Sequence, residues 1–300
     1  YASNMDENGP DVSGLPKEKI LELPTTGFKM QRGYLEAYAL YFSKFIKAYE
    51  AEGLEIQSVH VQNEPCSNHK FPSCNWRCED LAYFIGEYLG PKFEVENINT
   101  DIYFGTINRD NPEYTRKALE DKKAAKYIKG VGFQWDGKWA IPAIHNEYPH
   151  LKLMQTEMEC GNGSNDWGAA EYTWGIITHY LKHGANSFAY WNMVLDHTCT
   201  SPWGWKQNTL ITVNKQTKEV IYNPEYYVMK HVSHFVKPES YLLKTQGEGD
   251  NIAFINPDGN IILVLANRDD TPRKMSVSYD NMHFTLTLQE KSFNTIRLTR

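Results

Sequence analysis

The stretch VHVQNEP, residues 59–65, decides the fold class of this chain. Its apolar residues alternate with polar ones, as they do in a strand with one buried face, and the alternation predicts a strand over residues 56–62. Asn63 and Glu64 follow directly, and Pro65 cannot continue a sheet because it lacks a backbone N–H. The stretch therefore predicts a strand that ends by presenting an amide and a carboxylate.

Strand and helix patterns alternate along the first two thirds of the chain. Further strands are predicted at residues 100–106, 130–135, 152–157 and 187–194, and helices at residues 31–52, 79–89, 112–119, 122–129 and 167–183. Gly90 and Pro91 are expected to end the second helix. Strands that alternate with helices in this way predict parallel pairing through right-handed crossovers.

Polar side chains collect at the predicted carboxyl ends of these strands, namely Glu64, Gln134, Glu157 and Asn192. In a barrel these ends converge on one mouth, whereas a dinucleotide-binding sheet would show a G-x-G-x-x-G loop that is missing here. We therefore predict an α/β fold, a (β/α)₈ TIM barrel over residues 1–207. Only about five of the eight barrel strands can be found, so we expect the first strands to be missing from this chain.

The pattern changes after residue 207. Short strand-like segments follow one another between turn signals such as the run NPDG at residues 256–259, with a single helix expected over residues 224–235. Residues 208–300 are therefore predicted to form a second, antiparallel domain that resembles a β-sandwich.

The composition excludes some functions. The formal charge is −6, from 31 basic and 37 acidic residues, and no basic cluster is mixed with aromatic residues, so a nucleic-acid partner is not expected. No apolar run approaches the roughly 20 residues of a transmembrane helix.

The chain does not begin with Met, which we interpret as processing or truncation. Nothing in the sequence indicates an oligomeric state.

Three of the five cysteines, Cys66, Cys74 and Cys78, lie close together with His69 among them. Two interpretations are open, a zinc site and a loop disulfide, and the disulfide is favoured because the spacing lacks four clean metal ligands. A disulfide is typical of an oxidising compartment, so we expect a secreted or periplasmic protein.

Glu64 and Glu157 are the candidate catalytic pair. Each follows its own strand, and two carboxylates facing one barrel mouth are what cleavage of a glycosidic bond requires. One must be protonated to donate to the leaving oxygen, and the other must be ionised. Either carboxylate alone would more often be a solvated rim residue, but their shared placement favours the catalytic interpretation. Most of the many Trp and Tyr side chains are expected to pack in the core and at its edges, and a few are expected to offer flat surfaces for sugar rings.

Five motifs together resemble glycoside hydrolase family 30, which contains glucosylceramidases and endo-β-1,6-glucanases. They are VQNEP at 61–65, GVGFQWDGK at 130–138, QTEMECGNG at 155–163, YWN at 190–192 and SPWGWKQN at 201–208. The resemblance implies a TIM barrel with a C-terminal β domain, and a carbohydrate as substrate. It also implies retention of anomeric configuration through a covalent glycosyl-enzyme, which needs neither a metal nor an organic cofactor.

The resemblance also assigns roles to individual residues. Glu64 would be the general acid/base, Asn63 the partner of the sugar 2-hydroxyl, and Glu157 the nucleophile. Trp191 matches the aromatic residue that forms the floor of the subsite for the cleaved sugar. Glu159 remains an alternative nucleophile, because strand alternation places it on the same face as Glu157.

Gln134 and Trp135 are candidate substrate-binding residues, and they stand where glucosylceramidases usually carry His-Trp-Tyr. This departure favours an endo-β-1,6-glucanase. A glucosylceramidase and a non-catalytic carbohydrate-binding fragment remain as alternatives.

Overall fold

The computed structural model describes residues 27–67, 74–201 and 204–299. The chain divides into two compact units. The first comprises residues 1–159 and 183–189, and the second comprises residues 160–182 and 190–300. The domain boundary after residue 207 stays a prediction.

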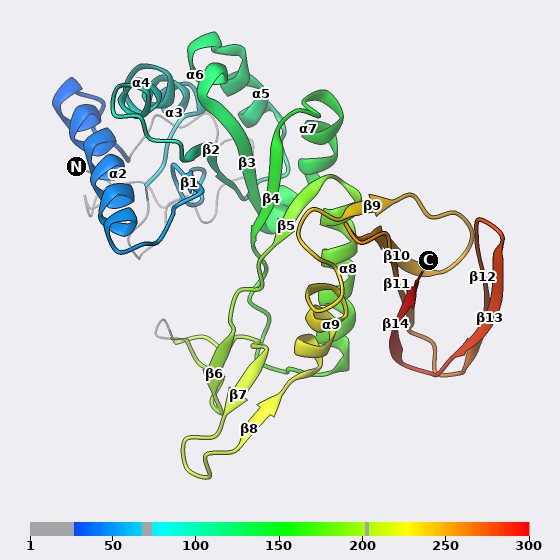
Figure 1. The fold of residues 1–300 in the computed structure, drawn as a ribbon. Helices are drawn as coiled ribbons and strands as arrows, with labels where there is room; N and C mark the ends of the chain where they lie inside the picture. The colour runs from blue at the N-terminus through cyan, green and yellow to red at the C-terminus, as the bar shows by residue number, and fades with distance from the viewer. Residues whose placement is uncertain (1–26, 68–73, 202–203, 300) are drawn as a thin grey trace. The chain divides into compact units, whose positions relative to one another are not determined.

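A five-stranded parallel sheet forms the centre of the first unit (Figure 1). Its strands pair in chain order, β1 (Ser58–His60), β2 (Asp101–Ile107), β3 (Ile128–Gln134), β4 (Lys152–Glu157) and β5 (Ala185–Phe188). The connecting helices are α2 (Arg32–Ala51), α3 (Cys78–Phe84), η2 (Ile85–Leu89), α4 (Gly90–Val95), α5 (Glu113–Glu120), α6 (Lys122–Tyr127), η3 (Trp135–Trp139) and α7 (Ile141–Glu147). The predicted alternation of parallel strands and helices is confirmed.

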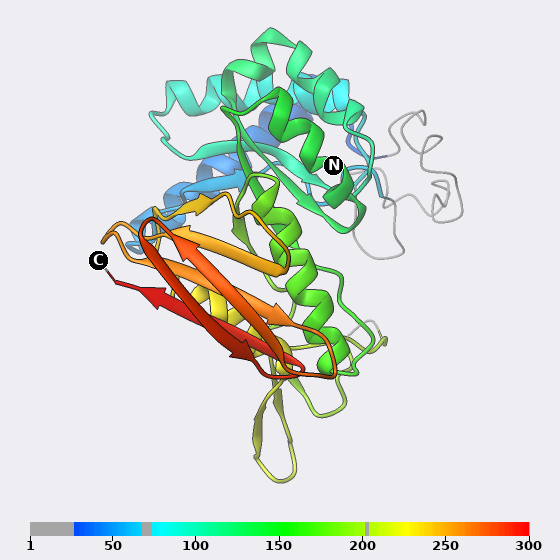
Figure 2. The same cartoon turned by 90° about the vertical axis from the view of Figure 1, so that its right-hand side faces the viewer.

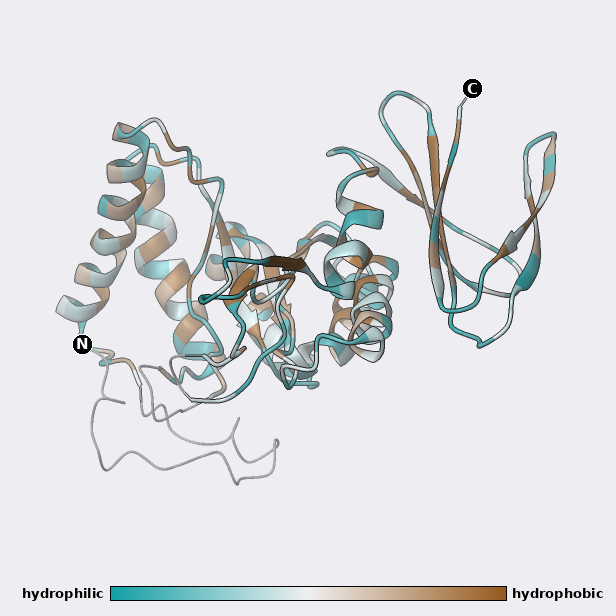
Figure 3. Ribbon diagram, turned by 90° about the horizontal axis from the view of Figure 1, so that it is seen from below, coloured by the Kyte–Doolittle hydropathy of each residue, from teal (hydrophilic) through white to brown (hydrophobic). Residues whose placement is uncertain are grey.

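Burial explains why these segments are strands and helices. Successive residues of β2 and β3 are buried, as expected of parallel strands that are covered on both faces. In α2 the buried residues recur at helical spacing, at Leu35, Ala39, Phe42, Ser43 and Ile46. Figure 3 shows the same helix, next to the N label, with alternating brown and teal bands.

The first strand is shorter than predicted. β1 ends at His60, and parallel pairing resumes at Asn63, which bridges Thr106 on β2. The pairing of β2 with β3 shifts its register between Tyr103 and Thr106, around Gly105, whose φ of 150° is open mainly to glycine. The chain between β1 and Asn63 stays hydrogen-bonded to β2, because the N–H of Val61 donates to the carbonyl of Tyr103 over 3.3 Å and the carbonyl of Gln62 accepts from the N–H of Thr106 over 3.1 Å.

The predicted end of a helix at Gly90 and Pro91 is wrong. The helix of α3 passes through the π-helical turn η2 and continues as α4 to Val95. Gly90 is needed for packing instead, because a Cβ at this position would lie 2.2 Å from the ring of Tyr127. Pro91 is the second residue of α4, directly after the turn η2, so the helix continues past this proline.

The predicted strand at residues 187–194 is also wrong beyond Phe188. β5 ends at Phe188, and β6 (Val194–Asp196) belongs to a different sheet with β7 (Ile211–Val213) and β8 (Val220–Tyr222). Trp191 and Asn192 therefore lie in a link between two strands. A helix that was not predicted, α7, begins with Pro142 in its first turn.

The second unit also contains the C-terminal β domain (Figure 2). Helices α8 (Trp167–Lys182) and α9 (Pro224–Ser233) pack together, and the strands are β9 (Tyr241–Leu243), β10 (Asp250–Ile255), β11 (Ile261–Asn267), β12 (Arg273–Tyr279), β13 (Met282–Leu288) and β14 (Ser292–Leu298). An antiparallel sheet in the order β14-β11-β10-β9 faces the hairpin β12-β13 across a core of Ala253, Leu263, Leu265 and Leu288. The predicted antiparallel domain is confirmed.

The expected loop disulfide is wrong, because all five cysteines are free thiols. Cys66, Cys74 and Cys78 are buried, and burial raises the pKa of the Cys66 thiol to about 12. The zinc alternative also invoked His69, which lies outside the described residues. Within those residues no group of three or more His, Cys, Asp or Glu side chains could hold a metal ion. No helix in the same part of the chain is long and apolar enough to cross a membrane.

Candidate active site

Glu64 stands just beyond β1 in a backbone conformation that few residues adopt. Its φ is 45°, in the left-handed region, which costs a residue with a Cβ roughly 1–2 kcal/mol. The backbone N–H of Glu64 donates to Oγ1 of Thr106 over 3.1 Å, and its carbonyl accepts from the N–H of Ser67 over 2.9 Å. The turn is therefore held by hydrogen bonds on both sides, and the backbone from which the half-buried Glu64 side chain extends is fixed in place.

Asn63 is anchored through one atom. Its Oδ1 accepts from the Thr106 hydroxyl over 3.0 Å and from Nε2 of Gln134 over 3.3 Å. Because both bonds fall on the carbonyl oxygen, the amide nitrogen is left as the donor that can face a ligand hydroxyl. Asn63 is exposed, so a ligand can reach it.

Gln134 continues this network across the sheet. It is the last residue of β3 and is fully buried. Its Nε2 donates to Asn63, and its Oε1 accepts from the hydroxyl of Thr156 on β4 over 3.2 Å. The side chains of Thr106, Asn63, Gln134 and Thr156 thus connect the ends of β1 to β4. The predicted contact of Gln134 with substrate stays a prediction.

Glu157 is the last residue of β4 and lies opposite Gln134 in the register of the sheet. The indole N–H of Trp135 donates to Oε1 of Glu157 over 3.1 Å. Trp135 also has a positive φ, 47°, and begins the 3₁₀ turn η3 directly after β3. With 36% of its surface exposed, Trp135 can bind Glu157 and still present its ring outward.

Glu159 has a different environment from Glu157. It lies beyond β4 and forms an ion pair with Lys138 on η3, and both side chains are largely buried. Nζ of Lys138 also donates to the carbonyl of Trp135 over 3.1 Å. A carboxylate that neutralises a buried ammonium group is a poor nucleophile, because attack would break this ion pair in a partly desolvated environment.

Trp191 belongs to the second unit, in the link between β5 and β6, and 45% of its surface is exposed. Its neighbour Asn192 is fixed by two bonds from Nδ2, to Oε1 of Gln207 over 3.1 Å and to the carbonyl of Asn208 over 3.0 Å. The role of Trp191 as the floor of a sugar subsite stays a prediction.

Five of the six predicted site residues, all but Trp191, lie at the carboxyl ends of neighbouring strands in one unit. The sequence reasoning missed three residues that hold them, Thr106, Lys138 and Thr156. Thr106 ends a predicted strand and Thr156 precedes Glu157, so their position at strand ends was the available signal. No comparable signal pointed to Lys138.

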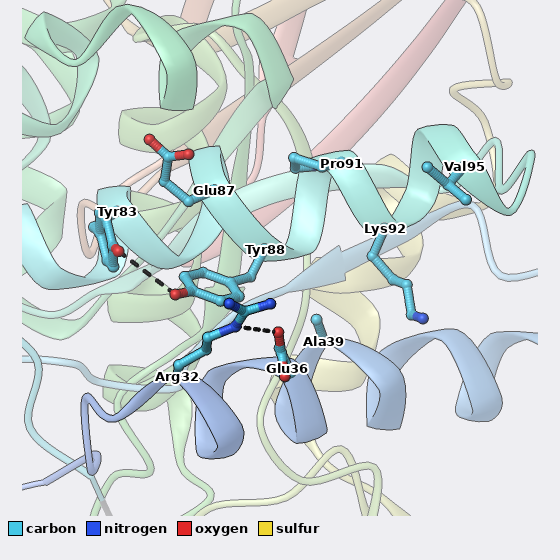
Figure 4. A pocket seen from close by; sticks show the side chains of 9 residues that line it. All are labelled: Arg32, Glu36, Ala39, Tyr83, Glu87, Tyr88, Pro91, Lys92 and Val95. Carbon is cyan, nitrogen blue, oxygen red and sulfur yellow. Dashed lines mark hydrogen bonds and ion pairs between the residues drawn. The ribbon is translucent and has the colours of Figure 1, made fainter.

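A groove in the same unit lies on the helices. An open groove of about 500 Å³ runs between α2 and the helix formed by α3, η2 and α4 (Figure 4). Its carboxylates are committed to ion pairs, Glu36 with Arg32 at 2.7 Å and Glu87 with Lys123. The groove therefore offers no second pair of available carboxylates, and the strand ends remain the candidate active site.

Comparison with known families identifies the architecture. Residues 25–236 match the model of the glycosyl hydrolase family 30 TIM-barrel domain. The chain belongs to glycosyl hydrolase family 30. Residues 242–296 match the β-sandwich domain of the same family. Both the resemblance drawn from the motifs and the predicted fold class, a TIM barrel followed by a β domain, are confirmed.

Relatives in family 30 include enzymes of two specificities. An endo-1,6-β-D-glucanase of Aspergillus fumigatus is 28% identical over 263 residues, which are 81% of this chain and 52% of that protein. The lysosomal acid glucosylceramidase of Mus musculus is 25% identical over 280 residues, 84% of this chain and 54% of that protein. The solved structure of an endo-β1,6-glucanase superposes with a TM-score of 0.79 at 28% identity, covering 89% of this chain and 64% of that one. The chain spans about half the length of the curated relatives that it matches.

Proposed function

We propose that this protein is a retaining glycosidase that cleaves internal β-glucosidic bonds of a β-1,6-linked glucan. In this proposal Glu64 and Glu157 are the two catalytic carboxylates. The observation that supports it is the hydrogen-bonded chain across β1 to β4, which fixes Asn63 and the backbone of Glu64 at one end and reaches the strand of Glu157 at the other. Membership of family 30 supports the assignment of this pair as the acid/base and the nucleophile of a glycosidase.

In the first step Glu157 attacks the anomeric carbon, and Glu64 donates its proton to the departing glycosidic oxygen. A covalent glycosyl-enzyme forms, and the reducing-end product leaves with that proton. In the second step Glu64 removes a proton from water, which attacks the same carbon and releases Glu157. The two inversions return the original configuration, and the mechanism predicts carboxyl groups about 5 Å apart.

The other site residues stabilise charge and bind the sugar. In this proposal Asn63 donates from Nδ2 to the 2-hydroxyl, a bond that strengthens in the transition state. Trp135 supports the ionised Glu157 through its indole N–H, and Trp191 stacks against a sugar ring. Gln134 is fully buried, so we assign it the support of Asn63.

A β-1,6-glucan is favoured over a glucosylceramide by the motif around Gln134 and Trp135. Two endo-1,6-β-D-glucanases, from Aspergillus fumigatus and Neurospora crassa, are among the relatives at 28% and 24% identity. Glucosylceramide is the second candidate, because a glucosylceramidase matches at 25% identity and putative glucosylceramidases of Caenorhabditis elegans match at 26–28%. A non-catalytic carbohydrate-binding role is the third.

Product release from pustulan, a β-1,6-glucan, separates the three candidates when glucosylceramide and xylan are assayed in parallel. The assay uses the protein with whatever sequence flanks these 300 residues in its source. Release of short gentio-oligosaccharides from pustulan supports the proposal, and release of glucose from glucosylceramide alone supports the second candidate. Binding to pustulan without release supports a carbohydrate-binding protein.

We place this activity outside the cytoplasm, in a secreted or periplasmic protein, because the proposed substrate is a polymer of cell walls. The free thiols remove the disulfide argument, so the placement depends on the substrate. Fractionation of the source cells tests it, and recovery of the protein with cytoplasmic markers would contradict it.

A further inference from the structure

Asn208 uses all of its polar groups inside the second unit. Its Oδ1 accepts from the backbone N–H groups of Asn162 over 3.1 Å and Gly163 over 2.7 Å. Its backbone N–H donates to the carbonyl of Cys160 over 2.6 Å, and its backbone carbonyl accepts from Asn192. One buried residue therefore ties the loop after β4 to the segment that carries Trp191.

The fit of the loop around Asn208 is tight. A Cβ on Gly161 would lie 2.5 Å from Cγ of Asn208, and Gly161 has a φ of 69°. Only glycine allows the loop backbone to pass this close in this conformation. The loop backbone at residues 160–163 therefore packs closely against the side chain of Asn208.

Asn208 is itself held by a carboxylate that the proposed reaction does not use. Its Nδ2 donates to Oε1 of Glu225 over 2.7 Å, and Glu225 is fully buried in the first turn of α9. Burial raises the pKa of this carboxyl, and Asp166 nearby acts in the same direction. The hydroxyl of Tyr190 lies beside the same carboxylate, and burial together with Glu225 raises the pKa of Tyr190. A fully buried carboxylate has a large desolvation cost, which indicates a specific role.

We propose that Asn208 and Glu225 form a clamp that positions two segments of the second unit, the loop at residues 160–163 and the segment around Trp191. The loop begins three residues after Glu157, the proposed nucleophile, and Asn192 directly follows Trp191. Glu225 sets the orientation of the Asn208 amide, because a carboxylate can accept a hydrogen bond from Nδ2 of that amide and not from Oδ1. This orientation directs Oδ1 toward the loop. Both are positioning residues, and the proposal rests on the proposed glycosidase function.

Hydrogen exchange at the backbone amides of Asn162 and Gly163 tests the clamp without requiring activity. Asn208→Leu keeps a similar volume but removes the acceptor, so both amides should exchange at least about tenfold faster, which corresponds to the loss of about 1.4 kcal/mol of protection. Amides of β11 report whether the fold is intact. Asn267→Leu is the matched control, because Asn267 is also buried and bonds to two loop carbonyls of the β domain. It should leave Asn162 and Gly163 unchanged.

A reversal of the pair tests the role of Glu225 even if Asn208→Leu does not fold. Asn208→Asp keeps the acceptor for the loop but places two carboxylates face to face, so exchange should rise. Glu225→Gln alone keeps an acceptor for Asn208 and should change exchange little. In the double variant the new amide at position 225 donates to the new carboxylate at position 208. The hydrogen bond is thus restored with its direction reversed, so exchange should return to near the wild-type rate. Wild-type exchange in Asn208→Leu, or no restoration by the second substitution, overturns the clamp. Absence of glycosidase activity would overturn the proposed function and leave these exchange rates interpretable.

Discussion

Trp135 donates its indole N–H to Glu157 over 3.1 Å; Trp135 directly follows β3, and Glu157 is the last residue of the neighbouring parallel strand β4. Trp135 reaches this position because it turns out of β3 with a φ of 47° into the turn η3. The contact gives Glu157 a defined orientation and a charge-assisted hydrogen bond, whereas Glu159 is paired with Lys138. This difference between the two glutamates leads to the first prediction.

Trp135→Phe keeps an aromatic ring but removes the donor to Glu157. A hydrogen bond to a charged group contributes about 1.5–3 kcal/mol, so we expect kcat on pustulan to fall at least about tenfold. Trp139→Phe is the control, since it changes an exposed indole at the other end of η3 and should alter kcat by no more than about twofold. Equal losses in both variants would mean that the indole of Trp135 does not support Glu157.

Thr106→Val removes the hydroxyl that accepts from the N–H of Glu64 and donates to Asn63. Because each orphaned polar group costs about 1–3 kcal/mol, we expect kcat/KM to fall about 10- to 100-fold, while the volume of the side chain is conserved. Thr115→Val is the matched control. Thr115 is equally buried, but its hydroxyl has no hydrogen-bond partner in the described part of the chain, so this change should leave kcat/KM and stability near wild type.

Gly90→Ala should destabilise the first unit. The added Cβ would lie 2.2 Å from the ring of Tyr127, and overpacking of this kind costs about 1–3 kcal/mol in the free energy of unfolding. Gly33→Ala provides the comparison, because Gly33 is also helical and has no atom within 4 Å of such a Cβ, so it should stabilise by up to about 1 kcal/mol. Urea unfolding measures both. Destabilisation of similar size in the two variants would show that the close packing against Tyr127 is not the cause.

His60 should make the protein less stable in mild acid. Burial lowers the pKa of His60, although a bond to the carbonyl of Gly105 opposes the shift. As the pH falls below the unfolded value of about 6.5, the unfolded chain takes up the proton first, so unfolding becomes more favourable. His60→Asn, which can still donate to Gly105, should reduce the loss of unfolding free energy between pH 7.5 and 5.5. His231, whose pKa burial also lowers, would account for a remaining loss. An unchanged loss in the variant contradicts the assignment to His60.

The strand ends could be predicted from the sequence because their signals are local. Alternation of apolar residues places β2, β3 and β4 within two residues of their observed bounds, and β4 at its observed ends. Gln134 and Glu157 follow from those ends, whereas β1 ends two residues before its predicted end and Glu64 lies four residues beyond its observed end. Pro65 was a correct signal that the strand stops, but the positive φ of Glu64 could not be read from it, because that conformation is imposed by the bond to Thr106.

The failures arose where tertiary packing overrides a local rule. Gly90 and Pro91 are a standard helix-stop signal, but the π-helical turn before them and the ring of Tyr127 beside them allow the helix to continue. The apolar run at residues 187–194 looked like one strand, whereas the chain changes sheets within it. Lys138 could not be assigned to Glu159, because they are 21 residues apart and only the turn η3 brings them together.

The central claim is that Glu157 becomes covalently bound to the sugar. Incubation with 2-deoxy-2-fluoro-β-gentiobiosyl fluoride slows the hydrolysis of a glycosyl-enzyme, so the labelled residue can be identified by peptide mass spectrometry. We predict a single sugar adduct on the peptide that contains residues 155–163, located by fragmentation at Glu157 and lost in Glu157→Gln. An adduct at Glu159, or hydrolysis of pustulan with inversion of the anomeric configuration, would contradict the account.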